Sequence, residues 1–353
     1  MIAGKALDLA CRLAVLVIAV ATGAGCRRVA GENDAVDVTY AASLTVAMAN
    51  VASSFREQTG REVRGDPRGS VAGAHLIREG VWRPDVYITA DPATMPLLGD
   101  HDPGWAIVFA RGELVLGYGD ASRHLAALDS AKAGLLPWPD VVLRPGFRLG
   151  RTDPDLDPKG YRAIFAFRLA EELYGRRGLA ARILSGPSGE RSVFPEEHLS
   201  ARVLTGSLDA AIFYLAEANQ QGLRHVSLPR PLNQGDPADA AVLAGLEYRT
   251  SDGRLFRAAP IAYAATVPLS SPDPRAGAEL IAFLVGADGN AVLEESGFVT
   301  GGMVLGDVSL VPALLSDVAA AGDVADERVR RSPRTPPADT TPGPSGPAGS
   351  PPR

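Results

Sequence analysis

Two serines and one aspartate stand where the chain changes from a strand-like pattern to a helix-like one. Ser43 and Ser70 each lie between a short strand-like segment and a helical one, and Asp157 begins a third helical pattern. The first turn of a helix leaves backbone N–H groups unbonded and carries a partial positive charge, so it attracts anions without a lysine or arginine. If these helix starts meet at one sheet edge, their hydroxyl and N–H groups form a site for a small oxyanion.

The same residues also have a plainer interpretation as helix caps. Serine and aspartate are preferred at the N-cap, where the side-chain oxygen accepts a hydrogen bond from a backbone N–H, and Pro158 after Asp157 fits the first helical position. Tyr214, which ends the segment A-A-I-F-Y, is equally explained as a half-buried tyrosine at a strand end. Because a carboxylate repels an anion, Asp157 assists binding only if the anion's central atom is a metal that accepts another oxygen ligand.

The sequence lacks the motifs of the common enzyme classes. We find no G-x-x-x-x-G-K-[ST] loop, no G-x-S-x-G elbow, no dinucleotide-binding glycine pattern and no H-E-x-x-H zinc motif. The two cysteines, Cys11 and Cys26, lie near the N-terminus, which excludes a disulfide or thiolate metal site in the rest of the chain. The formal net charge of −6 argues against nucleic-acid binding through a basic surface. A binding protein is therefore favoured over an enzyme.

Short apolar segments alternate with amphipathic ones between residues 35 and 315. Strands are predicted over 36–40, 61–64, 85–90, 113–118, 148–151 and 210–214. Helices are predicted over 44–59, 71–79, 160–174, 197–205, 215–221, 275–285 and 288–296. This alternation is typical of α/β proteins with mainly parallel sheets flanked by helices, and 353 residues correspond to about two domains.

The N-terminus has the order of residues found in an export signal. Lys5 and Arg12 precede an apolar run over 13–21, and small residues lead to Cys26. The run is shorter than the ~20 residues of a membrane-spanning helix, so residues 1–25 are predicted to be a signal peptide. The sequence G-A-G before Cys26 resembles a bacterial lipobox, in which the cysteine is lipidated; an ordinary cleaved signal is the alternative. Lipidation would tether the exported protein to a membrane surface.

Two further segments are expected to lie outside the folded part. Residues 26–34 are polar and are interpreted as a short tether. Residues 332–353 are rich in proline and have no apolar periodicity, which predicts a disordered and partly polyproline-like tail.

Several segments together resemble the molybdate/tungstate-binding proteins of ABC transporters, and most closely the tungstate-type branch. The runs A-A-S-L-T and D-P-K-G-Y-R are the most specific. The matching stretches occur in family order: Y-A-A-S-L-T-V-A-M (40–48), G-S-V-A-G-A-H-L-I (69–77), R-P-D-V-Y-I-T-A-D (83–91), F-A-R-G-E-L-V-L-G-Y (109–118), G-R-T-D-P-D-L-D-P-K-G-Y-R (150–162), L-T-G-S-L-D-A-A-I-F-Y (204–214) and parts of 266–298.

The resemblance implies a two-lobed periplasmic-binding-protein fold of type II-like form, with the ligand in the cleft. By that likeness the first lobe covers 35–112 and 234–312, and the second covers 113–233. The family function implies an exported, periplasmic or cell-surface receptor that delivers molybdate or tungstate to an ABC permease. It also implies a monomer that needs no cofactor besides its ligand.

Residue roles follow from the resemblance position by position. Ser43 and Ser70 would bind the oxyanion through hydroxyl and backbone N–H groups, and Lys159 would offer its backbone N–H. Asp157 would approach the metal atom of the bound oxyanion and help expand its coordination toward six. Tyr214 would close the site.

A second carboxylate is expected near this tyrosine in the tungstate branch. Glu217, one helical turn beyond Tyr214, is the nearest acidic residue and therefore the candidate. The segment 195–198 (P-E-E-H) matches a further backbone donor in the family.

Three other functions are also compatible with the sequence. A receptor for sulfate, phosphate or another small oxyanion would use the same helix starts, and the position of Asp157 relative to the cleft would separate the cases. An exported hydrolase could use Ser43 or Ser70 as its nucleophile, although the sequence places no histidine beside either. A sensory or adhesion lipoprotein that kept the fold is also compatible with the proline-rich tail.

Overall fold

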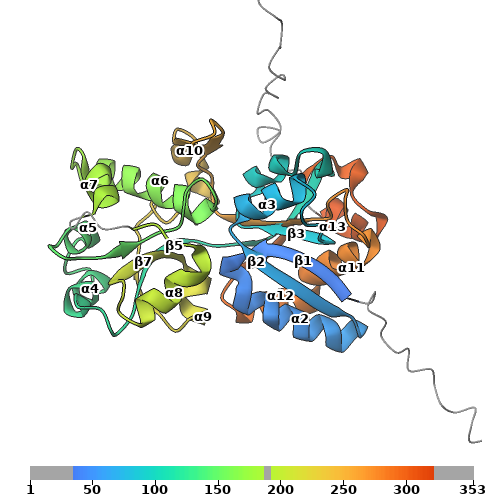
Figure 1. The fold of residues 1–353 in the computed structure, drawn as a ribbon, viewed down its shortest axis with the longest axis horizontal. Helices are drawn as coiled ribbons and strands as arrows, with labels where there is room; N and C mark the ends of the chain where they lie inside the picture. Colours follow the sequence, from blue (N-terminus) through green and yellow to red (C-terminus); the bar gives the residue numbers. More distant parts are fainter. Residues whose placement is uncertain (1–34, 187–191, 322–353) are drawn as a thin grey trace, which may run out of the picture.

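The computed structural model describes residues 35–186 and 192–321, which form two α/β lobes lying side by side (Figure 1). This arrangement confirms the predicted two-lobed α/β fold. The predicted signal peptide (1–25), the tether (26–34, with Cys26 as its first residue) and the proline-rich tail (332–353) lie outside the described residues.

In the described part of the chain, the first lobe is built on a sheet of six strands in the order β12-β4-β11-β3-β1-β2. The strands are β1 (Ala35–Ala41), β2 (Glu62–Arg68), β3 (Val86–Thr89), β4 (Trp105–Arg111), β11 (Ala262–Thr266) and β12 (Val299–Gly306). The covering elements are η1 (Ala42–Leu44), α2 (Thr45–Thr59), α3 (Ser70–Arg78), η2 (Pro92–His101), α11 (Pro274–Val285), α12 (Ala287–Glu295) and α13 (Ser316–Ala321).

Helices cover both faces of this sheet, with α3 on one face and α2 with α12 on the other (Figure 1). Helix α2 buries Ala47 together with Met48, Val51 and Phe55, and the last three are spaced by three and four residues on one helical face. Phe55 meets Phe283 of α11 edge to face at 5.5 Å between ring centroids. The apolar spacing that predicted this helix therefore also determines which of its faces packs on the sheet.

The second lobe, over the described residues, is built on a sheet of four strands in the order β6-β7-β5-β8. The strands are β5 (Leu114–Tyr118), β6 (Leu149–Gly150), β7 (Ala210–Tyr214) and β8 (Arg224–Ser227). The surrounding helices are α4 (Leu125–Lys132), α5 (Trp138–Val142), α6 (Pro158–Leu173), α7 (Leu179–Ser185), α8 (Glu196–Leu204) and α9 (Leu215–Gln220).

The prediction of mainly parallel sheets is wrong, because both sheets are mixed. Strand β1 pairs in parallel with β2 and β3, and β6 pairs in parallel with β7. The pairs β3–β11, β4–β11, β4–β12, β5–β7 and β5–β8 are antiparallel. The reason is the path of the chain: β4 leaves the first lobe and β11 re-enters it, so these two neighbours must run in opposite directions.

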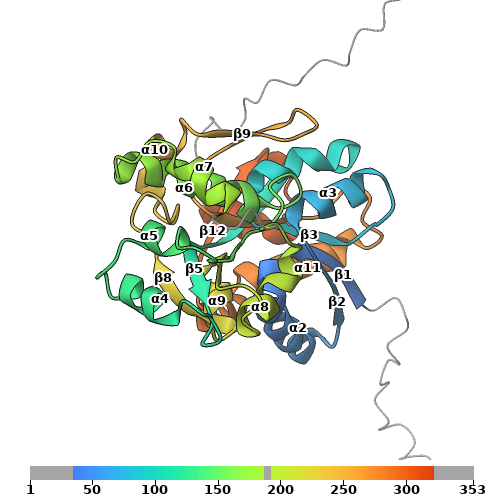
Figure 2. The same ribbon diagram turned by 60° about the vertical axis from the view of Figure 1, so that its left-hand side comes forward.

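The segment between β8 and β11 crosses back to the first lobe over the top of the molecule. It contains η3 (Pro237–Asp239), α10 (Ala240–Leu243), β9 (Glu247–Arg249) and β10 (Leu255–Arg257), and its hairpin lies over α6 (Figure 2). Tyr248 donates to Asp155 at 2.6 Å in the second lobe, whereas Arg254 lies 2.5 Å from His75 Nε2 on α3 of the first lobe. The hairpin therefore contacts both lobes.

No single helix within residues 35–186 and 192–321 has the length and apolar character needed to cross a membrane. The bent pair α11–α12 meets that test by length and composition only when the two helices are taken together.

Gly160, near the start of α6, packs closely against the backbone of the preceding loop. A Cβ at this position would lie 2.6 Å from Pro154 N and 2.7 Å from the carbonyl carbon of Asp153, both of which are backbone atoms. Gly160→Ala should lower the free energy of unfolding by about 1–3 kcal/mol, even though alanine is the better helix former. Gly245→Ala, an exposed position with open space around it, is the matched control and should be nearly neutral in urea unfolding. Increased stability of Gly160→Ala would contradict this packing.

Candidate functional site

Strand directions bring the predicted site residues to the boundary between the lobes. Strands β1, β2 and β3 run opposite to β11, which enters from the second lobe, so all three end toward that lobe. Strand β7 runs opposite to β5, which enters the second lobe, and β6 runs with β7, so both end toward the first lobe. Ser43, Ser70 and Asp157 follow the ends of β1, β2 and β6, and Tyr214 is the last residue of β7. Helix α8 adds its N-terminus and contacts η1 and β2 across the boundary.

Neither serine is a helix cap, so that simpler interpretation is wrong. The N-cap of α2 is Leu44 and that of α3 is Gly69, and neither makes a side-chain cap. Ser43 lies within η1, is buried, and has a hydroxyl without a hydrogen-bond partner among the described residues. The hydroxyl of Ser70 accepts a hydrogen bond from Ala90 N at 3.1 Å, which leaves its proton free to donate.

Asp157 caps α6, as its position before Pro158 predicts. Its Oδ1 accepts hydrogen bonds from Lys159 N and Thr152 Oγ1, both at 2.8 Å. The backbone N–H of Lys159, expected to donate to the ligand, therefore donates to Asp157 instead. A Cβ on Gly69 would lie 3.3 Å from Asp157 Oδ2, so this oxygen faces the first lobe.

The side chain of Lys159 is buried and joins two glutamates. Its Nζ lies 2.7 and 2.9 Å from the two carboxylate oxygens of Glu217 and 2.9 Å from Glu196 Oε1. Glu217 Oε2 also accepts a hydrogen bond from Tyr214 N at 3.3 Å. Glu217, which was expected to face the ligand's metal atom, therefore binds Lys159 and the backbone N–H at the start of α9. Lys159 holds the first turns of α6, α8 and α9 together.

Burial changes the proton affinity of the carboxyl groups around this lysine. Burial raises the pKa of Asp157 well above its usual range, and the negative charge of Glu196 raises it further. Burial also raises the pKa of Glu217, against the opposing effect of Lys159. The positive charge of Lys159, which pairs with Glu196 and Glu217, reduces the negative potential that an approaching anion meets.

A buried ion pair connects the lobes beneath this cluster. Arg162 Nη2 and the hydroxyl of Tyr161, both from α6, donate to Asp91 Oδ2 in the first lobe, each at 2.9 Å. Arg162 Nη1 donates to the carbonyl of Ala259 at 2.8 Å, and Gln234 Nε2 donates to the carbonyl of Arg162 at the same distance. The D-P-K-G-Y-R segment therefore fixes one lobe against the other as well as starting a helix.

Among the buried side-chain donors without a hydrogen-bond partner in the part of the chain that the structure describes, four belong to this region. They are Ser43 Oγ, the hydroxyls of Tyr214 and Tyr263, and Arg162 Nε. Buried polar groups in folded proteins are nearly always hydrogen-bonded, so a group of unpaired donors indicates a missing acceptor. An oxyanion supplies such an acceptor on every oxygen.

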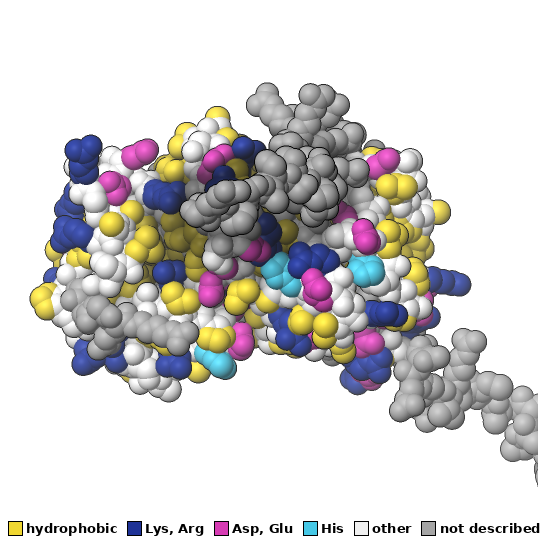
Figure 3. All heavy atoms as spheres, turned by 45° about the horizontal axis from the view of Figure 1, so that its top comes forward, with side chains coloured by type: hydrophobic (Ala, Val, Ile, Leu, Met, Phe, Trp, Pro, Cys, Tyr) yellow, Lys and Arg dark blue, Asp and Glu magenta, His cyan; other side chains and the backbone are white. Residues whose placement is uncertain are grey.

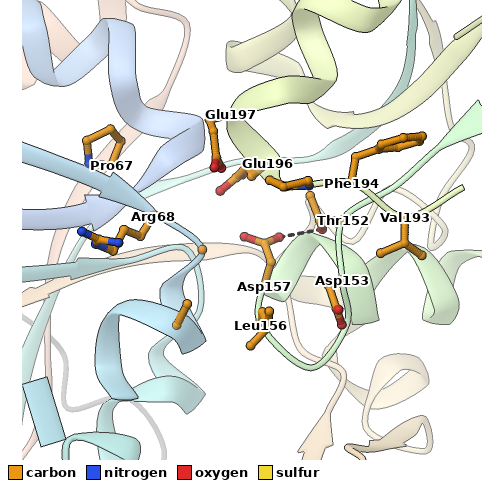
Figure 4. Close-up of a pocket in the computed structure, with 13 residues that line it drawn as sticks. Pro67, Arg68, Thr152, Asp153, Leu156, Asp157, Val193, Phe194, Glu196 and Glu197 are labelled. Carbon is orange, nitrogen blue, oxygen red and sulfur yellow. Dashed lines mark hydrogen bonds between the residues drawn. The ribbon is translucent and has the colours of Figure 1, made fainter. Parts of the chain in front are cut away.

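A cavity of about 330 Å³ lies between the lobes beside Asp157 and Glu196. The first lobe contributes Pro67, Arg68, Gly69 and Ala72 to its walls, and the second lobe contributes Thr152, Asp153, Leu156, Asp157 and residues 193–197. In Figure 4 the carboxylates of Asp157 and Glu196 face this space, with Arg68 on the opposite side. Side chains of both charge signs are interspersed over the outer surface in Figure 3, so that face does not attract one sign of charge.

Sequence reasoning missed several members of the site. Glu196 was expected only as part of a segment that supplies a backbone N–H, yet its side chain is 3% exposed and pairs with Lys159. Tyr263 and Arg162 were not assigned roles. The sole signal for Arg162 was its place in the D-P-K-G-Y-R segment, and the strand around Tyr263 was not predicted. No group of three or more His, Cys, Asp or Glu residues that could hold a metal ion is found in the described ranges.

The two lobes and the buried polar site at their boundary define a two-lobed solute-binding protein. The chain belongs to the bacterial extracellular solute-binding protein family, whose model matches residues 36–299. Membership in an extracellular family implies export.

Sequence relatives cover most of this chain. It is 34% identical to a putative ABC transporter molybdenum-binding protein of Haloferax volcanii, over 78% of this chain and 85% of the relative. It is 27% identical to the molybdate/tungstate-binding protein WtpA of Thermococcus kodakarensis, over 80% and 88% respectively.

Solved structures agree on the fold. The periplasmic molybdate-binding protein of Azotobacter vinelandii superposes with a TM-score of 0.51 at 17% identity, covering 75% of this chain and 98% of that one. The sulfate-binding protein SubI of Mycobacterium tuberculosis superposes with a TM-score of 0.53 at 15% identity, covering 83% and 92%. Both are periplasmic-type binding proteins with two lobes, as the type II-like prediction requires.

The lysine–glutamate cluster makes a prediction about stability. Lys159→Met removes the positive charge between Glu196 and Glu217 and should lower the free energy of unfolding by about 3–5 kcal/mol at pH 7. The pKa of Glu217 is already raised by burial and should rise further in the variant. A raised folded-state pKa contributes stability at low pH that is lost as pH rises, so the variant should regain stability between pH 7 and pH 5.

Urea unfolding across this pH range measures the effect. Arg83→Met, at an exposed position before β3, is the control and should leave the pH profile unchanged. A Lys159→Met variant as stable as the wild type at pH 7 would show that the two glutamates do not depend on the lysine.

Proposed function

We propose that this chain is an exported receptor that binds molybdate or tungstate between its lobes and delivers it to an ABC permease. The observation that carries the proposal is the group of buried, unpartnered donors where helix starts of both lobes meet. The two sequence relatives described above, named for molybdenum and for molybdate or tungstate, support the choice of ligand.

The donor set suits a small dianion removed from water. Ser43, Ser70 and Tyr214 offer neutral hydroxyl protons, and the first turns of α3 and η1 add backbone N–H groups and partial positive charge. Ala72 N at the start of α3 donates to the carbonyl of Leu156 at 3.2 Å, which holds the two lobes close around the site. These neutral hydroxyl and N–H donors can bind an oxyanion without a positively charged side chain beside it.

Asp157 distinguishes a metal-centred anion from other anions. Its Oδ1 caps α6, whereas Oδ2 faces the space between the lobes (Figure 4). Molybdenum and tungsten accept additional oxygen ligands, so this oxygen can bind the central atom. The sulfur of sulfate and the phosphorus of phosphate do not, so the carboxylate would only repel those anions. We assign Glu217 the role of holding the side chain of Lys159 in position.

The remaining features of the function are proposed on the same basis. Residues 35–112 with 234–312 form one lobe and residues 113–233 form the other. Cys26 carries the lipid that anchors the mature protein to the membrane surface, and the receptor works as a monomer. No nucleic acid takes part.

Catalysis by the serines has no support in the geometry. A nucleophilic serine needs a base within hydrogen-bond reach, and no histidine among the described residues bonds to Ser43 or Ser70. His75, which lies on α3, is engaged by Arg254. We therefore assign binding and not hydrolysis.

The two serines should differ in what they contribute. Ser43→Ala removes a hydroxyl without a protein partner, so the free energy of unfolding should hardly change while the affinity for tungstate falls about 10- to 100-fold. Ser70→Ala should weaken binding similarly and also cost about 1–3 kcal/mol of stability, because Ala90 N–H loses its acceptor.

Isothermal titration of the wild type and both variants with molybdate, tungstate, sulfate and phosphate tests this. The wild type should bind the two metal oxyanions more tightly than sulfate or phosphate. Retained tungstate affinity in the double variant would place the ligand elsewhere.

Asp157→Asn separates helix capping from ligand binding. Asparagine caps a helix about as well as aspartate, so the melting temperature should stay nearly constant. The amide oxygen is a poorer ligand for molybdenum or tungsten, so affinity for their oxyanions should fall by more than about 10-fold, whereas sulfate binding should be unchanged or improved. Titration of both anions into both proteins gives the comparison. Tungstate binding by Asp157→Asn as tight as that of the wild type would reduce Asp157 to a cap.

A further inference from the structure

We propose that Tyr263 is a further ligand-binding residue, whose hydroxyl donates to the bound oxyanion from the first lobe while Tyr214 donates from the second. This inference rests on the proposed function, because it assigns one more contact in the same site.

The burial of Tyr263 is the first argument. The residue lies on β11, its side chain is 0% exposed, and its hydroxyl has no hydrogen-bond partner among the described residues. Burying a phenol without satisfying its O–H is costly, and tyrosine is normally placed where that group finds a partner. Phenylalanine would fill the same volume without the cost, so the hydroxyl points to a function.

The arrangement of the two tyrosines is the second argument. The rings of Tyr214 and Tyr263 meet edge to face with centroids 5.7 Å apart, one from each lobe. Their hydroxyls do not bond to each other, and both are unpaired. Burial raises the pKa of both hydroxyls well above the usual range, and the Ser43 hydroxyl, which lies near that of Tyr263, opposes the rise there. Both hydroxyls therefore lie around the buried polar space that Ser43 also faces.

The surroundings of the Tyr263 ring fix its direction. Phe298 packs edge to face against it at 5.2 Å between centroids, and Phe109 lies at 6.4 Å. Gly112 leaves room for the ring, since a Cβ there would lie 3.2 Å from Cε2 and 3.5 Å from the hydroxyl oxygen of Tyr263. With its sides packed, the residue can offer its hydroxyl to a ligand without rearrangement.

The consequence is a ligand held by one phenol from each lobe. Hydroxyl groups donate to unprotonated oxygens of a tetrahedral dianion, and two lobes that each supply a donor are drawn together by the same anion. The ligand then stabilises the arrangement in which the lobes are close together, because only there can both hydroxyls bind the same anion.

Tyr263→Phe, which keeps the ring and removes the hydroxyl, tests the inference. Titration with tungstate and molybdate should show affinity weakened about 10- to 100-fold, whereas the melting temperature of the ligand-free protein should be unchanged or slightly raised. Tyr118→Phe is the matched control, because that hydroxyl donates to Asp129 in the second lobe, away from the site, and its loss should leave affinity unchanged.

A second readout distinguishes direct binding from a structural role. In protein labelled with ¹³C at the tyrosine ζ carbons, the resonance that Tyr263→Phe removes should shift when tungstate binds. Affinity within about twofold of the wild type, or a Tyr263 resonance that tungstate leaves unmoved, overturns the inference alone. A wild type that binds none of molybdate, tungstate, sulfate or phosphate overturns the proposed function with it.

Discussion

The direction in which the chain crosses between the lobes determines the position of the site. Because β4 leaves the first lobe and β11 returns to it, the parallel strands beside them must end at the boundary, and the same holds for β6 and β7 on the other side. Helix starts follow these strand ends. The fold therefore gathers backbone N–H groups and hydroxyls from both lobes in one buried region, where a small anion can satisfy them.

The acidic side chains in this region are partly neutralised by a buried lysine, which the net charge of the chain does not reveal. The chain carries a net charge of −6, and the site itself contains Asp157, Glu196 and Glu217. Lys159 pairs with two of these carboxylates, and burial raises the pKa of Asp157 well above its usual range. The positive charge of Lys159 lowers the electrostatic cost of admitting an anion, and neutral hydroxyls supply the contacts. The Arg162–Asp91 pair lies at the same boundary and adds a fixed connection between the lobes.

Local signals in the sequence were enough to predict the α/β fold and the cap at Asp157, because apolar periodicity and the Asp-Pro pair depend on neighbouring residues. Strand pairing was not predictable in the same way. The antiparallel partners of β11 lie far away in the chain, and the sheets were wrongly expected to be mainly parallel. Contacts of side chains such as Lys159 with Glu196, or the meeting of Tyr214 with Tyr263, depend on the packing of separate segments. No spacing in the sequence indicates them.

The central claim is that an oxyanion binds where the helix starts of the two lobes meet. Anomalous diffraction at the tungsten edge, from crystals of the tungstate-loaded protein, locates the metal directly. We expect one strong peak between Ser43, Ser70 and Tyr214, with Asp157 Oδ2 within bonding distance of the metal. A peak at another place on the protein, or a protein that crystallises without tungstate at saturating concentration, would contradict the claim.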